Sequence, residues 1–237
     1  MSRQNSPARR HIMRHTAVAA ALATAVPMAP GMASNYELML AQLAEHRHQL
    51  KGIQSTEAKA ARKLALLPEY DAYIDGALAS DAGGQDDIIT TLMVWHIDAG
   101  SFERAVQIGE YVIRHGLAMP DQYKRSPAAA LVEETAEAAI KAKASGEPFD
   151  LRLLNRLANI TSGIDMHDQI RAKLHKAIGL TLGKDEASKV YLEEAVIHLT
   201  RALELHDKSG VKKEIEAIER RIKAIDKEQA SASTGAD

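Results

Sequence analysis

The chain has 237 residues, of which 46% are hydrophobic and 26% are charged, so it can bury the core of one large domain or two small ones. The absence of cysteine excludes disulfides, thiolate metal sites and a cysteine nucleophile, and the net charge of −2 excludes a protein that is basic as a whole. Aromatic residues make up only 4% whereas Ala and Leu are abundant, a composition that predicts an all-α fold.

Residues 1–34 are predicted to form a basic, alanine-rich arm or helix that contains no acidic residue. Its arginines are Arg3, Arg9, Arg10 and Arg14. Ser6 and Pro7 suit the N-cap and the first position of a helix. Pro27 and Pro30 are expected to end that helix. An export signal and a tail without a role are the alternatives, but the apolar run is mostly alanine and shorter than the roughly 18 residues of a membrane span, so the basic helix is preferred.

A helical core is predicted over residues 35–120, and its first segment carries a basic face. Apolar residues recur at helical spacing from Tyr36 onward, Gly52 is expected to bend this helix, and a further helical run is predicted up to Leu67. One continuous helix would place most of a series of cations on a single stripe that can contact phosphate groups. These cations are Arg47, Lys51, Lys59, Arg62 and Lys63. An ordinary solvated face is an equally good interpretation, because Glu57 dilutes the cluster.

The second half of this core predicts an antiparallel helix hairpin around the turn DAGS. The first helix lies in GQDDIITTLMVWHIDAG and the second in SFERAVQIGEYVIRHG. Acidic residues in the first turn suit the helix dipole, and Gly100 and Gly116 follow the two helix ends as C-cap glycines do. Phe102, Ala105 and Val106 begin the apolar face of the second helix.

Residues 121–226 are predicted to form further helices that resemble single tetratricopeptide units, since a period of about 34 residues is not sustained. The link before them contains a short basic pair, Lys124 and Arg125. Apolar residues from Val211 to Ile225 are spaced 4-3-4-3, which predicts a packing seam against a partner helix. Residues 227–237 are predicted to be a disordered tail.

Motifs for catalysis are weak. The stretch GLTLGKDE resembles a phosphate-binding loop, but it is one residue short and Asp185 replaces the hydroxyl that would hold magnesium, so a helix C-cap at Gly183 is preferred. A metal-dependent nuclease needs converging carboxylates. The weak candidates are Asp86, Asp87, Glu133, Glu134 and Glu137. Adjacent residues point about 100° apart on a helix, so we expect no catalytic residue, no metal and no cofactor, with magnesium required only for a nuclease.

Two histidine pairs lie on predicted helices. His11 and His15 are four residues apart and could share a zinc ion, but no third ligand lies nearby in the sequence. His46 and His48 point to different sides of their helix. Solvated histidines are therefore the preferred interpretation of both pairs.

Five stretches of sequence are familiar in their order: SPARRHIMRHTA, YELMLAQLAEHRHQLKGIQSTEAKAARKLALLPEY, GQDDIITTLMVWHIDAGSFERAVQIGEYVIRHGLAMP, RAKLHKAIGLTL and GVKKEIEAIERRI. From about Ser6 to Ile225 they resemble the small terminase subunit of tailed bacteriophages with cohesive-ended genomes, a family also labelled terminase endonuclease subunit. The middle stretch, with Trp95, is the most distinctive. Relatives tend to end in a basic extension, whereas this chain ends with Glu228 and Asp237, which puts in doubt any contact made there.

The resemblance implies a protein that binds the packaging site on double-stranded viral DNA, assembles as a ring-like homo-oligomer, and recruits and regulates a large ATPase subunit. It implies work in the host cytoplasm, without export and without a membrane. Arg9, Arg10 and Arg14 are then interpreted as DNA or subunit contacts, and the alanine-rich helix as a surface that packs against a neighbour. Two alternatives stay open: a metal-dependent endonuclease subunit of the terminase, and a tetratricopeptide-like module that binds protein only.

Overall fold

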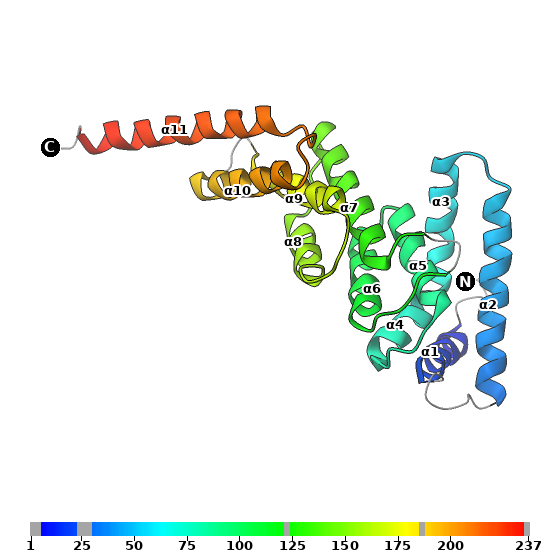
Figure 1. The fold of residues 1–237 in the computed structure, drawn as a ribbon. Coiled ribbons are helices and arrows are strands. Elements are labelled where there is room, and N and C mark those ends of the chain that lie inside the picture. The colour runs from blue at the N-terminus through cyan, green and yellow to red at the C-terminus, as the bar shows by residue number, and fades with distance from the viewer. Residues whose placement is uncertain (1–5, 23–29, 121–123, 185–187, 235–237) are drawn as a thin grey trace. The chain divides into compact units, whose positions relative to one another are not determined.

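The computed structural model describes residues 6–22, 30–120, 124–184 and 188–234, and every regular element in these ranges is a helix (Figure 1). The prediction of an all-α fold is confirmed for this part of the chain. The chain divides into two compact units, Met1–Leu131 and Val132–Asp237, and we describe each by itself. None of the described helices is both long and apolar enough to cross a membrane.

Unit 1 contains six α-helices and a short 3-10 helix among its described residues. They are α1 (Pro7–Leu22), α2 (Pro30–Lys51), α3 (Thr56–Leu66), η2 (Leu67–Glu69), α4 (Asp71–Ser80), α5 (Asp87–Asp98) and α6 (Phe102–Arg114). The helix α7 (Pro127–Ala144) begins in unit 1 and continues into unit 2. The remaining helices of unit 2 are α8 (Leu151–Ile160), α9 (Asp168–Leu182), α10 (Lys189–Leu205) and α11 (Lys212–Thr234).

The N-terminal helix α1 begins as the sequence predicts, because the Ser6 hydroxyl accepts a hydrogen bond from the backbone N–H of Arg9 at 3.3 Å. The described part of α1 runs to Leu22, and Pro27, which was expected to end this helix, lies outside the described residues. Pro30, the second proline expected to end it, is the first residue of α2. A proline is favoured at that position because its missing N–H would have no partner in the first turn of a helix.

Helix α1 is part of the core of unit 1, whereas the sequence analysis placed an arm ahead of the core. Ala17 is fully buried and Ala21 is almost so. The neighbouring backbones approach so closely that a Cβ atom added at Gly76 would lie 2.6 Å from the Arg14 carbonyl oxygen, and one at Gly84 would lie 2.0 Å from that of Ala21. The small surface of α1 thus packs against α4 and its exit loop in the same chain.

Helices α2 and α3 form two separate elements, so the chain lacks the single continuous helix that would place the predicted cations on one stripe. The Gly52 N–H bonds the Gln49 carbonyl at 3.2 Å, and the helix ends at Lys51. Ser55 then caps α3, since its hydroxyl accepts from the Ala58 N–H at 3.2 Å. The chain therefore stops and starts a helix within four residues, and α3 lies beside α2 (Figure 1).

Helices α5 and α6 occupy the two stretches that the sequence analysis assigned to a helix hairpin. The Asp86 carboxylate caps α5 by accepting from the backbone N–H of Ile88 at 2.9 Å. Between the helices, Gly100 has φ of 73°, the left-handed conformation that favours glycine, and the Ser101 N–H bonds the His96 carbonyl at 2.8 Å. The two helices pack on each other and supply much of the buried core of the unit.

Unit 2 is centred on the antiparallel pair α9 and α10. A Cβ atom at Gly179 would lie 2.7 Å from Leu199 Cγ and 3.0 Å from the Ala195 carbonyl oxygen, so only glycine lets α10 approach this far. Gly183 caps the end of α9 through its N–H to the Gly179 carbonyl at 2.9 Å. This confirms the preferred interpretation of the stretch GLTLGKDE, although Asp185 itself lies outside the described residues.

Helix α11 packs against α10 through the apolar seam that the sequence indicated. Val211 is fully buried, Ile218 is 5% exposed, and Ile215 and Ile222 are half-buried. The helix runs to Thr234, through most of the segment predicted to be a disordered tail. That segment is rich in Lys, Glu, Gln and Ala, which are good helix formers, so an established helix can continue through it.

Candidate nucleic-acid interface

Helices α2 and α3 meet at a turn (Figure 1), and basic residues lie on both sides of it. Arg47 and Lys51 are in the last turns of α2, and Lys59 and Arg62 are in the first turns of α3. Arg62 Nη2 donates to Gln49 Oε1 at 3.0 Å, which ties the two helices together beside the turn. We call Arg47, Lys51, Lys59 and Arg62 the hairpin tip. The tip gathers four of the five cations that the sequence placed on one helical stripe, and it does so by reversing the chain.

Lys51 and Arg62 of the hairpin tip are exposed, whereas Arg47 and Lys59 are half-buried. The fifth predicted cation, Lys63, has a different role, because its ammonium group forms an ion pair with Asp98 at the end of α5. Cations that remain exposed can still exchange their counterions for DNA phosphates. The hairpin tip is therefore able to contact DNA, while Lys63 holds α3 against α5.

The arginines of α1 also differ in role: Arg9 bonds other elements of the fold, whereas Arg10 and Arg14 are exposed. The Arg9 guanidinium donates to Gln42 Oε1 of α2, and Gln42 Nε2 donates to Glu69 Oε2 at 3.0 Å. Arg9 thus links α1 to two other elements of the core. Arg10 and Arg14 are exposed on the same helix.

The predicted basic pair Lys124 and Arg125 is exposed in the segment before α7. It directly precedes Ser126, whose hydroxyl caps α7 by accepting from the Ala129 N–H at 3.2 Å. These two cations therefore lie beside a fixed helix start.

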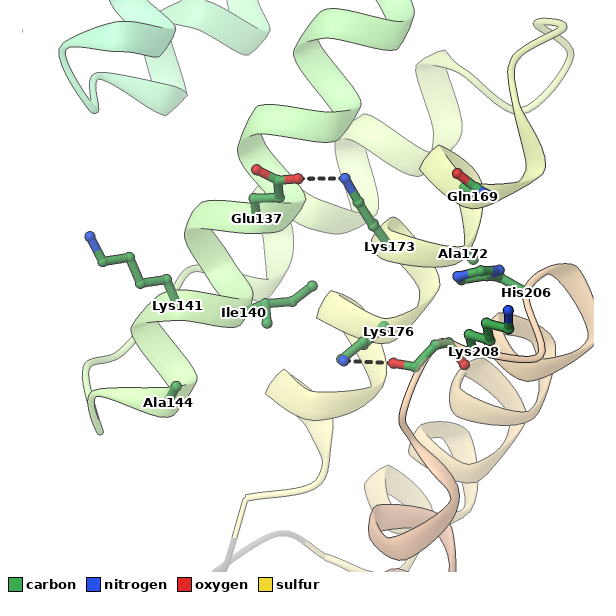
Figure 2. Close-up of a pocket in the computed structure, with 11 residues that line it drawn as sticks. Glu137, Ile140, Lys141, Ala144, Gln169, Ala172, Lys173, Lys176, His206 and Lys208 are labelled. Carbon is green, nitrogen blue, oxygen red and sulfur yellow. Dashed lines mark hydrogen bonds and ion pairs between the residues drawn. The ribbon is translucent and has the colours of Figure 1, made fainter. Parts of the chain in front are cut away.

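Unit 2 contains a second basic surface, a pocket of about 390 Å³ formed by α7, α9 and the loop after α10 (Figure 2). Four lysines line it, and we call it the lysine pocket. They are Lys141, Lys173, Lys176 and Lys208. Its apolar lining residues are Ile140, Ala144 and Ala172. Such a mixture of apolar lining and a few charged groups is typical of sites for small molecules or for single groups of larger ones.

Two of these lysines are held by the protein itself. Lys173 donates to Glu133 Oε1 at 2.6 Å and also to Glu137, and Figure 2 shows it directed from α9 toward α7. Burial would lower the pKa of Lys173, but its bonds to the two glutamates outweigh burial and raise it, so the ammonium group stays charged. Lys176 donates to the Ser209 carbonyl at 2.7 Å and fixes the loop after α10.

The other two lysines are open to a ligand. Lys141 and Lys208 are exposed, and neither forms a hydrogen bond or ion pair with another residue that the structure describes. Figure 2 shows their ammonium groups extending outward from different sides of the pocket. Ser209 also lines the pocket, and its hydroxyl is buried without a hydrogen-bond partner among the described residues. This site was not predicted from the sequence.

The carboxylates considered for a nuclease serve other purposes where the structure describes them. Asp86 is 2% exposed and accepts bonds from Tyr73 Oη at 2.6 Å and from the first turn of α5. Asp87 is exposed in that same first turn, in unit 1. In unit 2, Glu133 and Glu137 bind Lys173, and Glu134 is half-buried on the same helix. Among the described residues there is no group of three or more His, Asp or Glu that could hold a metal ion.

One histidine departs from the sequence interpretation. His46 is buried, with its Nδ1 atom 2.8 Å from the Tyr70 hydroxyl, whereas it was expected to be solvated like its neighbour. Burial lowers the pKa of His46, so the ring is neutral at physiological pH. His48 is exposed, as are His11 and His15. No local spacing pointed to this hydrogen bond, because Tyr70 follows His46 by 24 residues and lies between η2 and α4.

Comparison with known proteins finds similarity to phage terminase proteins. The chain is 43% identical over 233 residues to the protein named "Terminase, endonuclease subunit" of Escherichia phage P2, which covers 98% of this chain and 91% of that protein. The model of the family described as phage small terminase subunit matches residues 40–169. A "Probable terminase, endonuclease subunit" of Haemophilus phage HP1 (strain HP1c1) is 25% identical over 170 residues, 68% of this chain and 60% of that protein. No solved structure matches.

Proposed function

The chain belongs to the phage small terminase subunit family, and from this premise we propose that it starts the packaging of phage DNA by binding double-stranded DNA at the packaging site. We further propose that it assembles as a ring-like homo-oligomer and recruits and regulates the large ATPase subunit, in the host cytoplasm. The protein itself then breaks no covalent bond. The observation that supports DNA binding is the position of four cations beside the turn between α2 and α3, of which Lys51 and Arg62 are exposed and Arg47 and Lys59 are half-buried.

The hairpin tip suits the phosphate backbone for two reasons. Its cations come from the adjoining ends of two helices that one side-chain hydrogen bond joins, so their spacing is fixed by the fold. Phosphate contacts by lysine and arginine supply most of the sequence-independent affinity for DNA and make it depend steeply on salt. Arg10 and Arg14 of α1 and the pair Lys124 and Arg125 add exposed positive charge to the same unit.

The test is a titration of the full-length chain with duplex DNA that carries the packaging site, repeated over a series of salt concentrations. We expect the variant K51Q/K59Q/R62Q to flatten the plot of log binding constant against log salt, with a slope smaller by roughly 2 to 3, because each lost phosphate contact removes about 0.9. The control K213Q/K223Q/K227Q removes the same charge from exposed positions of α11. Equal slopes in the two variants would rule out the hairpin tip as the DNA surface.

An endonuclease subunit is the second candidate function, because the names of both relatives contain the word endonuclease. Asp86 is buried and bonded to Tyr73, and Glu133 and Glu137 bind Lys173, so we propose that the word endonuclease describes the complex of both subunits. Purified chain incubated with site-bearing DNA and magnesium should leave the DNA uncut. Cleavage that survives purification to homogeneity would assign the activity to this chain.

A module that binds only protein is the third alternative, and it predicts no mobility shift of DNA at any salt concentration.

The native mass of the particle, measured with and without DNA, tests the proposed self-assembly. A monomer under both conditions would contradict the oligomer. Mixing with the large subunit and repeating the mass measurement tests the proposed recruitment.

A further inference from the structure

We infer that the lysine pocket of unit 2 binds a phosphate ester, with the phosphate group at the lysines and the attached organic group against Ile140, Ala144 and Ala172. This phosphate can belong to a DNA strand or to a free nucleotide. The inference rests on the proposed function only where DNA is taken as its source.

The charge around the pocket favours an anion. Four ammonium groups line it, and Glu137 is the only carboxylate among the described residues that do so. That carboxylate is already committed to Lys173, together with Glu133, which lies outside the pocket lining. The remaining positive charge of Lys141, Lys176 and Lys208 is not matched by any acidic partner that the structure describes. An anion in the pocket would relieve the mutual repulsion of these groups.

The hydrogen-bond donors favour phosphate over a carboxylate. Each ammonium group has three protons, and Lys176 uses one of them on the Ser209 carbonyl. The buried Ser209 hydroxyl adds a donor without a partner in the described chain. Lysine stems rotate freely in solvent, so the exposed ammonium groups of Lys141 and Lys208 can turn toward a bound group. A phosphate carries up to two charges and several acceptor oxygens, and so it satisfies more of these donors than a carboxylate does.

The size and lining of the pocket favour an ester over free phosphate. A volume of about 390 Å³ is much larger than a phosphate ion requires and lies within the range of small-molecule sites. The lining next to the lysines is apolar, contributed by one face of α7 and by Ala172 of α9 (Figure 2). A sugar or base attached to the phosphate would cover this apolar surface.

The test compares two variants of the full-length chain with equal loss of charge. K141Q/K208Q changes the two lysines that the fold does not use, and K143Q/K213Q changes two exposed lysines of the same unit that do not line the pocket. Calorimetric titration with inorganic phosphate, adenosine monophosphate and a poly-glutamate peptide reports direct binding. We expect the wild type to bind the nucleotide more tightly than inorganic phosphate. Nucleotide affinity should fall at least tenfold in K141Q/K208Q, because two charge-assisted hydrogen bonds are lost, and by less than about twofold in the control.

A second arm, the salt dependence of duplex DNA binding, separates the two sources of phosphate. A slope reduced by about 2 in K141Q/K208Q but not in the control assigns the pocket to the DNA backbone, and an unchanged slope together with lost nucleotide binding assigns it to a free nucleotide. Either result supports the inference. It is overturned if poly-glutamate alone binds, or if the two variants behave alike toward every probe. A DNA slope that falls only in the hairpin-tip variant would then leave the proposed function intact while the pocket inference fails.

Discussion

Asp86 offers a quantitative prediction about stability, because its carboxyl group is buried. It is 2% exposed, and burial raises its pKa from 3.8 to about 6, although bonds from Tyr73 and from the Ile88 and Ile89 N–H groups oppose the rise. The change to test is Asp86→Asn. An asparagine oxygen can still cap α5, and the Tyr73 hydroxyl can accept from the amide, so the exchange removes the charge and keeps the contacts.

The magnitude follows from the two pKa values. Below pH 3.8 the carboxyl is protonated in the folded and unfolded chains alike. Between pH 3.8 and about 6 the unfolded chain releases its proton while the folded chain retains it, so the wild type loses stability as the pH rises. The loss amounts to about 3 kcal/mol and is complete above the folded-state pKa. Asp86→Asn should escape this loss, and so become more stable relative to wild type as the pH rises.

The assay is urea denaturation of both proteins, followed by far-UV circular dichroism at several pH values from about 4 to about 7. The quantity to compare is the difference between the two free energies of unfolding at each pH. Burial lowers the pKa of His96 and of His175 to about 4, which destabilises the fold in acid, but both proteins contain these histidines and the difference cancels them. A difference that stays constant over this range would refute the raised pKa of the Asp86 carboxyl. Loss of DNA cleavage by the assembled complex in Asp86→Asn would instead support a nuclease role for Asp86.

Three further predictions concern packing and titration. Gly84→Ala should lower the free energy of unfolding by about 3 kcal/mol or more, because its Cβ would lie 2.0 Å from the Ala21 carbonyl oxygen. The control Gly163→Ala has open space around it and should change the free energy of unfolding by less than about 1 kcal/mol. Similar urea midpoints for the two variants would contradict the close approach of α1. Thr135→Val should raise the melting temperature, by the equivalent of about 1 kcal/mol, because the Thr135 hydroxyl is buried without a partner among the described residues, and a lower melting temperature would show that it has one. Burial and the neighbouring His198 lower the pKa of His175 to about 4, so its contribution to stability is present above pH 6.5 and is lost as the pH falls toward 4. His175→Gln should flatten this loss of stability in an acid titration. Parallel curves of unfolding free energy against pH for the variant and the wild type would count against it.

Local signals in the sequence identified the helices that have clear caps. Ser6, Asp86, Gly100 and Gly183 all act where short-range chemistry placed them. The break between α2 and α3 was missed because the 3.6-residue pattern continues across Gly52, and the capping bond of Ser55 outweighs that continuity. Periodicity reports which face of a helix is apolar, but it does not report whether the helix is interrupted.

Features that depend on distant residues were beyond the sequence. The alanine pattern of α1 would be the same whether this face packed against another subunit or, as found, against Gly76 and Gly84 of its own chain. The lysine pocket joins α7, α9 and a loop after α10, and no spacing along the chain brings Lys141 and Lys208 together. Four of the five cations of the proposed stripe lie on two helices joined by a turn, where only a bend at Gly52 was expected.

The most direct test of the central claim measures the binding of the unmodified, purified chain to duplex DNA from the packaging region as salt is varied. We predict binding at low salt, a linear fall of log affinity with log salt, and full-length DNA recovered afterwards in the presence of magnesium. No binding even at the lowest salt, or DNA recovered as cut fragments, would contradict a DNA-binding packaging subunit that is itself not a nuclease.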